Sequence, residues 1–65
     1  MMTIEKMRAE ELASEIREAQ CWDEVENQLA ELCEIAGMAD EWKAADGETF
    51  ESVVYAAAKK LGVEL

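Results

Sequence analysis

The chain has 65 residues, with 16 acidic side chains against 6 basic ones, a formal net charge of −10, no His, no Pro and two Cys. A chain of this length forms at most one domain, and its single core is close to the lower size limit for stability. It is too short to enclose a substrate cavity of the usual enzyme size. Its negative charge argues against direct binding to nucleic-acid phosphates or anionic lipid. We therefore expect one acidic domain over residues 1–65.

The composition indicates a folded, all-α protein. Hydrophobic residues make up 51 % of the chain, which is too many for a disordered acidic tail. Alanine, Glu and Leu dominate, and all three are strong helix formers. No basic start leads into an apolar run, and the longest uncharged stretch, residues 52–58, is too short to span a bilayer. We expect a cytoplasmic protein with free thiols and no membrane segment.

The first helix is expected over about residues 4–20, with Thr3 as its N-cap. Helical spacing places one apolar stripe on this helix, made of Ala9, Leu12, Ala13, Ile16 and Ala19. Ile4 and Met7 lie outside the stripe. They cover the edge of the core, fray with the end of the helix, or contact a partner.

The second helix is expected over about residues 24–36, with Asp23 as its cap and Glu26 completing a capping box. Its stripe consists of Val25, Leu29, Leu32, Cys33 and Ala36, and Gly37 follows as a left-handed C-terminal residue. In one continuous helix this stripe would point away from the first. We therefore expect the chain to turn at residues 21–23. The alternative is a single long helix in an intertwined dimer.

Two further helices follow. Residues 38–45 are expected to form a short helix, in which Met38, Trp42 and Ala45 share one face. The pair Asp46-Gly47 indicates a turn. The last helix is expected over residues 50–61, with Thr49 as cap and Gly62 as its end, and Val63 packs back onto it. The predicted fold is a small bundle of three main helices plus one short helix, with dimerisation as a way to complete its core.

No constellation of residues for metal binding or catalysis stands out. A tetrahedral zinc site needs four ligands, mostly Cys and His, and the chain offers two cysteines and no His. Asp40 and Glu51 have the spacing of calcium-loop ends, but Trp42 and Ala44 occupy the positions between them that need oxygen ligands. Serine has no His to activate it, and the carboxylates follow no pattern typical of acid–base catalysis. We expect no metal, no cofactor and no enzymatic activity.

The cysteines are expected to differ in environment. Cys33 lies on the apolar stripe of the second helix and is expected in the core. Cys21 falls in the turn. A disulfide between them is disfavoured, because about 1.5 Å of helix rise per residue places their Cα atoms too far apart.

Aromatic and acidic side chains that the predicted core does not require indicate where a partner binds. Trp42 is expected in the core, whereas Trp22, at the turn, fits the core and an interface equally well. Tyr55 is a candidate contact because it lies off the apolar stripe of the last helix, which consists of Phe50, Val53, Val54, Ala57 and Leu61. Residues 1–34 hold ten acids and three bases, against six and three in residues 35–65. The candidate partner-binding residues are Ile4, Met7, Trp22, Tyr55, Glu10, Glu11, Glu15 and Glu18.

Two functions fit these features. The first is a non-enzymatic protein–protein interaction module that acts through helix-face contacts, with another protein or a second copy of itself as the partner. The alternative is an acidic nucleic-acid-mimicking inhibitor or regulator of a DNA- or RNA-binding protein, of the kind that a phage or other mobile element encodes. Neither function requires direct contact with nucleic acid or membrane.

Overall fold

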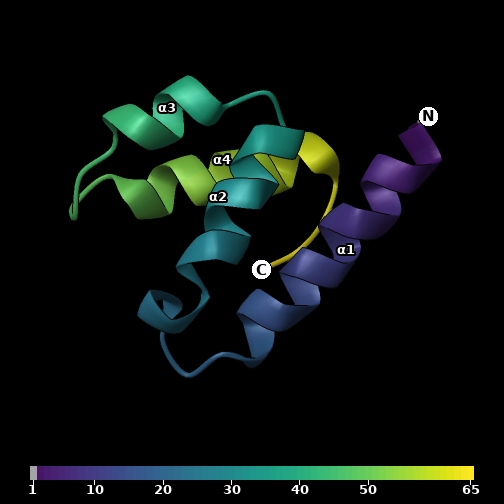
Figure 1. The fold of residues 1–65 in the computed structure, drawn as a ribbon, viewed down its shortest axis with the longest axis horizontal. Coiled ribbons are helices and arrows are strands. Elements are labelled where there is room, and N and C mark those ends of the chain that lie inside the picture. Colours follow the sequence, from purple (N-terminus) through teal and green to yellow (C-terminus); the bar gives the residue numbers. More distant parts are fainter. Residues whose placement is uncertain (1) are drawn as a thin grey trace.

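The computed structural model describes residues 2–65, with side chains from Ile4 onward, and it is all-α, as predicted. The element order is α1 (Met2–Glu18), the short 3-10 helix η1 (Trp22–Val25), α2 (Glu26–Ile35), α3 (Ala39–Ala44) and α4 (Phe50–Leu61). Figure 1 shows α1 on one side of the molecule, α3 on the other, and α2 and α4 between them. Within residues 2–65, no helix combines the length and apolar character needed to cross a membrane.

The core forms where α1, α2 and α4 meet. Helix α2 packs against α1, α3, α4 and η1. Helix α1 runs antiparallel to it, since Arg8 contacts Glu31 near one end of the pair and Glu15 contacts Gln28 near the other. The largest fully buried side chains come from these three helices and are Leu12, Ile16, Leu29, Leu32, Val54 and Cys33. One chain therefore buries the predicted stripes of α1 and α2 against each other.

The predicted turn between the first two helices is confirmed, and the single long helix is wrong. Helix α1 ends at Glu18, the chain bends through residues 19–21, and η1 begins at Trp22. Cys21 has extended backbone angles (φ −144°, ψ 154°), which break the helical path. No Gly or Pro is involved. The break brings Leu12 and Ile16 of α1 onto the same core as Leu29 of α2.

Two predicted helix caps are wrong. Thr3 belongs to the backbone of α1, which begins at Met2, so Thr3 cannot precede that helix; its side chain lies outside the described residues. Asp23 lies within η1, and α2 starts only at Glu26, after Val25, without a side-chain cap. The capping-box spacing was overridden because the chain forms a tighter 3-10 turn here, which lets Trp22 pack against the core.

The last helix has its predicted bounds and its predicted N-cap residue, Thr49, but that residue makes no side-chain cap bond to α4. Asp46 organises the turn instead, because its Oδ1 accepts hydrogen bonds from the backbone N–H groups of Glu48 (2.9 Å) and Thr49 (3.0 Å). The hydroxyl of Thr49 donates to the same oxygen (3.1 Å). An Asp that binds the backbone two residues ahead forms an Asx turn, so the Asp46-Gly47 turn prediction is confirmed.

Glycines end α2 and α4, as predicted. Gly37 and Gly62 have positive φ angles of 76° and 75°. In each case the residue directly after the glycine donates back into the helix: Met38 N–H to the Cys33 carbonyl (2.8 Å) and Val63 N–H to the Ala58 carbonyl (3.0 Å). These are Schellman caps. The second cap turns the chain end toward α1, where the Arg17 guanidinium donates to the backbone carbonyl of Glu64 (2.6 Å).

Candidate functional site

The four aromatic side chains of the chain form one continuous row, which we call the aromatic row: Tyr55, Trp22, Phe50 and Trp42. The ring centroids of Tyr55 and Trp22 lie 5.4 Å apart and those of Trp22 and Phe50 lie 6.1 Å apart. Phe50 and Trp42 follow at 6.4 Å. These separations lie in the range in which aromatic pairs attract each other beyond simple burial.

Three elements distant in the sequence build the aromatic row. Trp22 begins η1, Trp42 lies on α3, and Phe50 and Tyr55 lie on the first half of α4. Trp22, Trp42 and Phe50 are half-buried and pack against the core, whereas Tyr55 is 55 % exposed. The row therefore has one side on the core and one side in solvent, with Tyr55 as its most exposed member.

Two open hollows flank the aromatic row. The larger, which we call the Tyr55 hollow, has a volume of about 490 Å³. Its lining includes Tyr55, Trp22, Phe50, Cys21, Arg17 and Leu65. The smaller, which we call the Trp42 hollow, has a volume of about 320 Å³. Its lining is Trp22, Asp23, Glu26, Leu29, Trp42, Ala45, Asp46, Gly47 and Phe50. Trp22 and Phe50 contribute to both hollows, so the row forms a ridge with a depression on each side.

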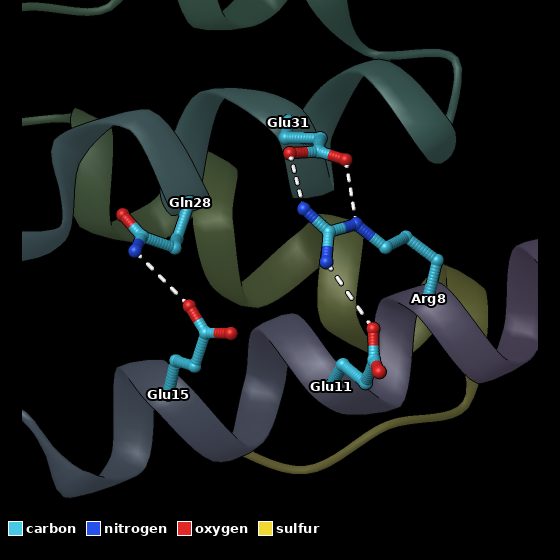
Figure 2. A network of polar contacts seen from close by, with 5 residues as sticks. All are labelled: Arg8, Glu11, Glu15, Gln28 and Glu31. Carbon is cyan, nitrogen blue, oxygen red and sulfur yellow. Dashed lines mark hydrogen bonds and ion pairs between the residues drawn. The ribbon is translucent and has the colours of Figure 1, made fainter.

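A polar seam lies at a different place, between α1 and α2 (Figure 2). The Arg8 guanidinium donates to both carboxylate oxygens of Glu31 (2.8 and 3.0 Å) and to Glu11 (3.2 Å). Further along, the Gln28 amide donates to the Glu15 carboxylate (3.0 Å). The hydrogen bonds from Arg8 hold the pKa of the Glu31 carboxyl below its usual range and raise the pKa of Arg8 itself.

The structure brings together only some of the candidate binding residues. Trp22 and Tyr55 are in contact within the aromatic row. Ile4 and Met7 are 74 % and 62 % exposed on the N-terminal half of α1, and neither lines the two hollows. The four candidate carboxylates all lie on α1 and are exposed: Glu10, Glu11, Glu15 and Glu18. Of the eight candidates, only Trp22 and Tyr55 line the two hollows.

The carboxylates on α1 also differ in what they bind. Glu11 and Glu15 accept hydrogen bonds from Arg8 and Gln28, respectively, so each of these carboxylates already has a partner within the chain. Glu10 and Glu18 have no ion pair among the described residues. A phosphate-mimicking surface on α1 would therefore depend on Glu10 and Glu18 more than on the other two.

Sequence reasoning missed two members of the aromatic row. Phe50 and Trp42 were assigned to the core, and they are half-buried with a surface in the hollows. Their spacing on α3 and α4 indicates which face of each helix is apolar, but the spacing carries no information on how the two helices meet. The sequence does carry one signal for such a row. A 65-residue chain has a small core, so aromatic side chains that gather in one place keep part of their surface exposed.

The cysteines match the prediction. Both are free, with Cys33 buried and Cys21 exposed beside the aromatic row. Burial, together with the nearby Glu41 carboxylate, raises the pKa of the Cys33 thiol to about 11. Among residues 2–65, no group of three or more His, Cys, Asp or Glu side chains is arranged to hold a metal ion.

Comparison of the chain with protein-family models, with curated proteins and with solved structures finds no match.

Proposed function

We propose that this chain is a non-enzymatic interaction module that binds another protein through the aromatic row and the two hollows beside it. The observation that carries the proposal is that all four aromatic side chains gather in one half-exposed row. Tyrosine and Trp are enriched at the centres of protein interfaces, because they supply a large, rigid contact area with little loss of conformational entropy.

Charge favours a basic partner. The net charge is −10, and the hollows are lined by the carboxylates of Asp23, Glu26, Asp46 and Glu51 against the single cation of Arg17. Such a potential attracts positively charged surfaces and accelerates their association. The partner in this proposal is therefore a protein segment that combines apolar and basic side chains. The module acts in the cytoplasm, which fits its free cysteines.

The test uses two faces of the same chain. A photo-crosslinking amino acid is placed at Glu51, beside the aromatic row, or at Met7, on the outer surface of α1, and the protein is irradiated in its native host. The protein captured from the Glu51 position is then purified, and its affinity is measured by calorimetry. We expect Tyr55→Ala to weaken binding at least about tenfold, as is usual for an interface hot spot, while the control Met7→Ala changes it less than about twofold.

Three outcomes would contradict the proposal. Crosslinks from Met7 alone would place the interface on α1. Equal affinity of the wild type and Tyr55→Ala would remove the aromatic row from the interface. Loss of binding on charge reversal at Glu10 and Glu18, with Tyr55→Ala unaffected, would favour the phosphate-mimicking alternative. Light scattering over a dilution series identifies the case in which the captured protein is a second copy of the chain.

A further inference from the structure

The Trp42 hollow, like the Tyr55 hollow, has three aromatic walls. Trp22, Trp42 and Phe50 all line it. The ring of Phe50 stands at 68° to Trp22 and at 82° to Trp42. Rings that meet at steep angles enclose a corner, whereas stacked rings present a flat slab. The faces of aromatic rings carry partial negative charge and attract cations that come within about 6 Å.

The same hollow carries only negative formal charge. Asp23, Glu26 and Asp46 line it, and no Lys or Arg does. Asp46 is fixed in place by the turn before α4, where its side chain accepts every one of its hydrogen bonds through Oδ1. These bonds hold the pKa of its carboxyl below the usual range, so the group stays ionised at neutral pH. Its second oxygen has no hydrogen bond among the described residues.

We propose that the Trp42 hollow binds the side-chain cation of a Lys or Arg from the partner, with the rings of Trp22, Trp42 and Phe50 around its stem and the carboxylates of Asp23, Glu26 and Asp46 at its charge. This inference rests on the proposed function and names the side chain that the aromatic row recognises. A purely apolar side chain would remove water from three carboxylates without replacing their hydrogen bonds, which costs free energy. An anion would be repelled. A Lys or Arg side chain has an apolar stem for the rings and a charged head for the carboxylates.

The test uses capped pentapeptides of sequence Ala-Ala-X-Ala-Ala, where X is Lys, Arg or norleucine, which has an apolar linear side chain. Binding to the full chain is followed by NMR through the indole N–H signals of the two tryptophans, each assigned from a Trp→Phe variant. We expect the Lys and Arg peptides to shift the signals of Trp22 and Trp42 in a saturable way. We expect the norleucine peptide to bind at least about fivefold more weakly, because it lacks the charge that the rings and carboxylates attract.

Two variants with the same net charge separate a local site from general attraction. Asp23→Asn with Glu26→Gln removes two carboxylates from the hollow, and we expect it to weaken the Lys peptide at least about fivefold. Glu5→Gln with Glu34→Gln removes two exposed carboxylates that line neither hollow, and we expect a change below about twofold. Trp42→Leu keeps an apolar side chain at that position and removes the ring, and we expect it to weaken the Lys peptide as well. Circular dichroism checks that each variant is folded.

The outcomes distinguish this inference from the proposed function. Equal binding of the norleucine and Lys peptides, or equal losses in the two charge variants, would overturn the cation site and leave protein binding through the aromatic row intact. The same holds if Trp42→Leu is folded and binds the Lys peptide as the wild type does. Failure of Tyr55→Ala to weaken the captured partner would instead overturn the proposed function.

Discussion

The polar seam and the aromatic row are both built from partly exposed side chains, but their groups are satisfied in different ways. In the seam, Arg8 contacts Glu31 and Glu11, and Gln28 contacts Glu15, so the polar groups bind each other within the chain. The seam closes the outer edge of the α1–α2 pair (Figure 2). In the aromatic row, each ring contacts the next, but apolar surface of the row also lines two open hollows.

This difference separates stability from recognition. A hydrogen bond between exposed groups replaces bonds to water and adds little net free energy, so the seam helps to orient α1 on α2 and contributes little more. Apolar surface in a hollow remains in contact with water and gains free energy when another molecule covers it. We therefore expect changes in the row to affect both folding and binding, and changes in the seam to affect folding alone.

The largest expected effect on stability comes from the centre of the aromatic row. Trp22→Ala removes a side chain that packs against the core and contacts both Phe50 and Tyr55. We expect the free energy of unfolding to fall by about 2–3 kcal/mol, less than for a fully buried Trp. Urea unfolding followed by circular dichroism measures the loss.

The matched control is Tyr55→Ala, at the exposed end of the same row. Because Tyr55 is 55 % exposed, its removal is expected to cost less than about 1 kcal/mol. Equal losses in the two variants would show that the row is structural along its whole length, and the comparison between row and seam would then fail.

The sequence predicted the bundle because its stripes are strong. The stripe residues of the first two predicted helices are all buried except Ala19, which is partly buried. The phase difference between the two stripes correctly required a turn. The caps were harder to predict. Asp23 and Thr49 fit local cap patterns, but Asp23 lies inside a 3-10 helix, and the Thr49 hydroxyl donates to Asp46 in the turn before α4 and makes no cap bond to α4. Short-range patterns state which bonds are available, whereas packing decides which ones form.

The middle expected effect tests the seam. Arg8→Ala removes the hydrogen bonds to Glu31 and Glu11 and leaves several carboxylates close together. We expect the melting temperature to drop by a few degrees, with unchanged binding of the Lys pentapeptide, because exposed ion pairs contribute little. The drop should shrink in about 1 M salt, where charges are screened within about 3 Å. Arg8→Lys is the matched control, since it keeps the charge and loses the two-pronged contact.

Loss of peptide binding in a folded Arg8→Ala variant would contradict the expectation that the seam affects folding alone, and the separation between the polar seam and the aromatic row would fail. That separation cannot be predicted from the sequence, because the patterns that make Trp22 and Tyr55 candidates also select Ile4, Met7 and four carboxylates of α1. All of them are surface groups by pattern. The path of the chain through residues 19–25 brings Trp22 against Phe50 and Tyr55 of α4, whereas the α1 candidates line neither hollow.

The smallest expected effect compares one carboxyl from each region. Glu31 in the seam and Asp46 beside the aromatic row both have pKa values below the usual range, Glu31 because Arg8 donates to it and Asp46 because the Glu48 and Thr49 groups donate to it. A carboxyl with a lower pKa in the folded state adds stability above its unfolded pKa. That stability is lost as the pH falls through the folded pKa. We expect the urea midpoint to fall as the pH drops below about 4.

Two variants assign that loss to its regions. Arg8→Ala removes the cause of the shift at Glu31, whereas Asp46→Asn removes the titrating group and keeps an oxygen that accepts the backbone hydrogen bonds. Each variant should therefore lose less stability between neutral and acidic pH than the wild type does, and the two reductions should add, because the sites share no partner. If the Asp46→Asn variant lost as much stability in acid as the wild type does, the turn before α4 would not depend on the charge of Asp46. The Trp42 hollow would then keep its geometry in acid while losing the carboxylate that we assign to the bound cation, so acidification would weaken the Lys pentapeptide before it loosened the fold.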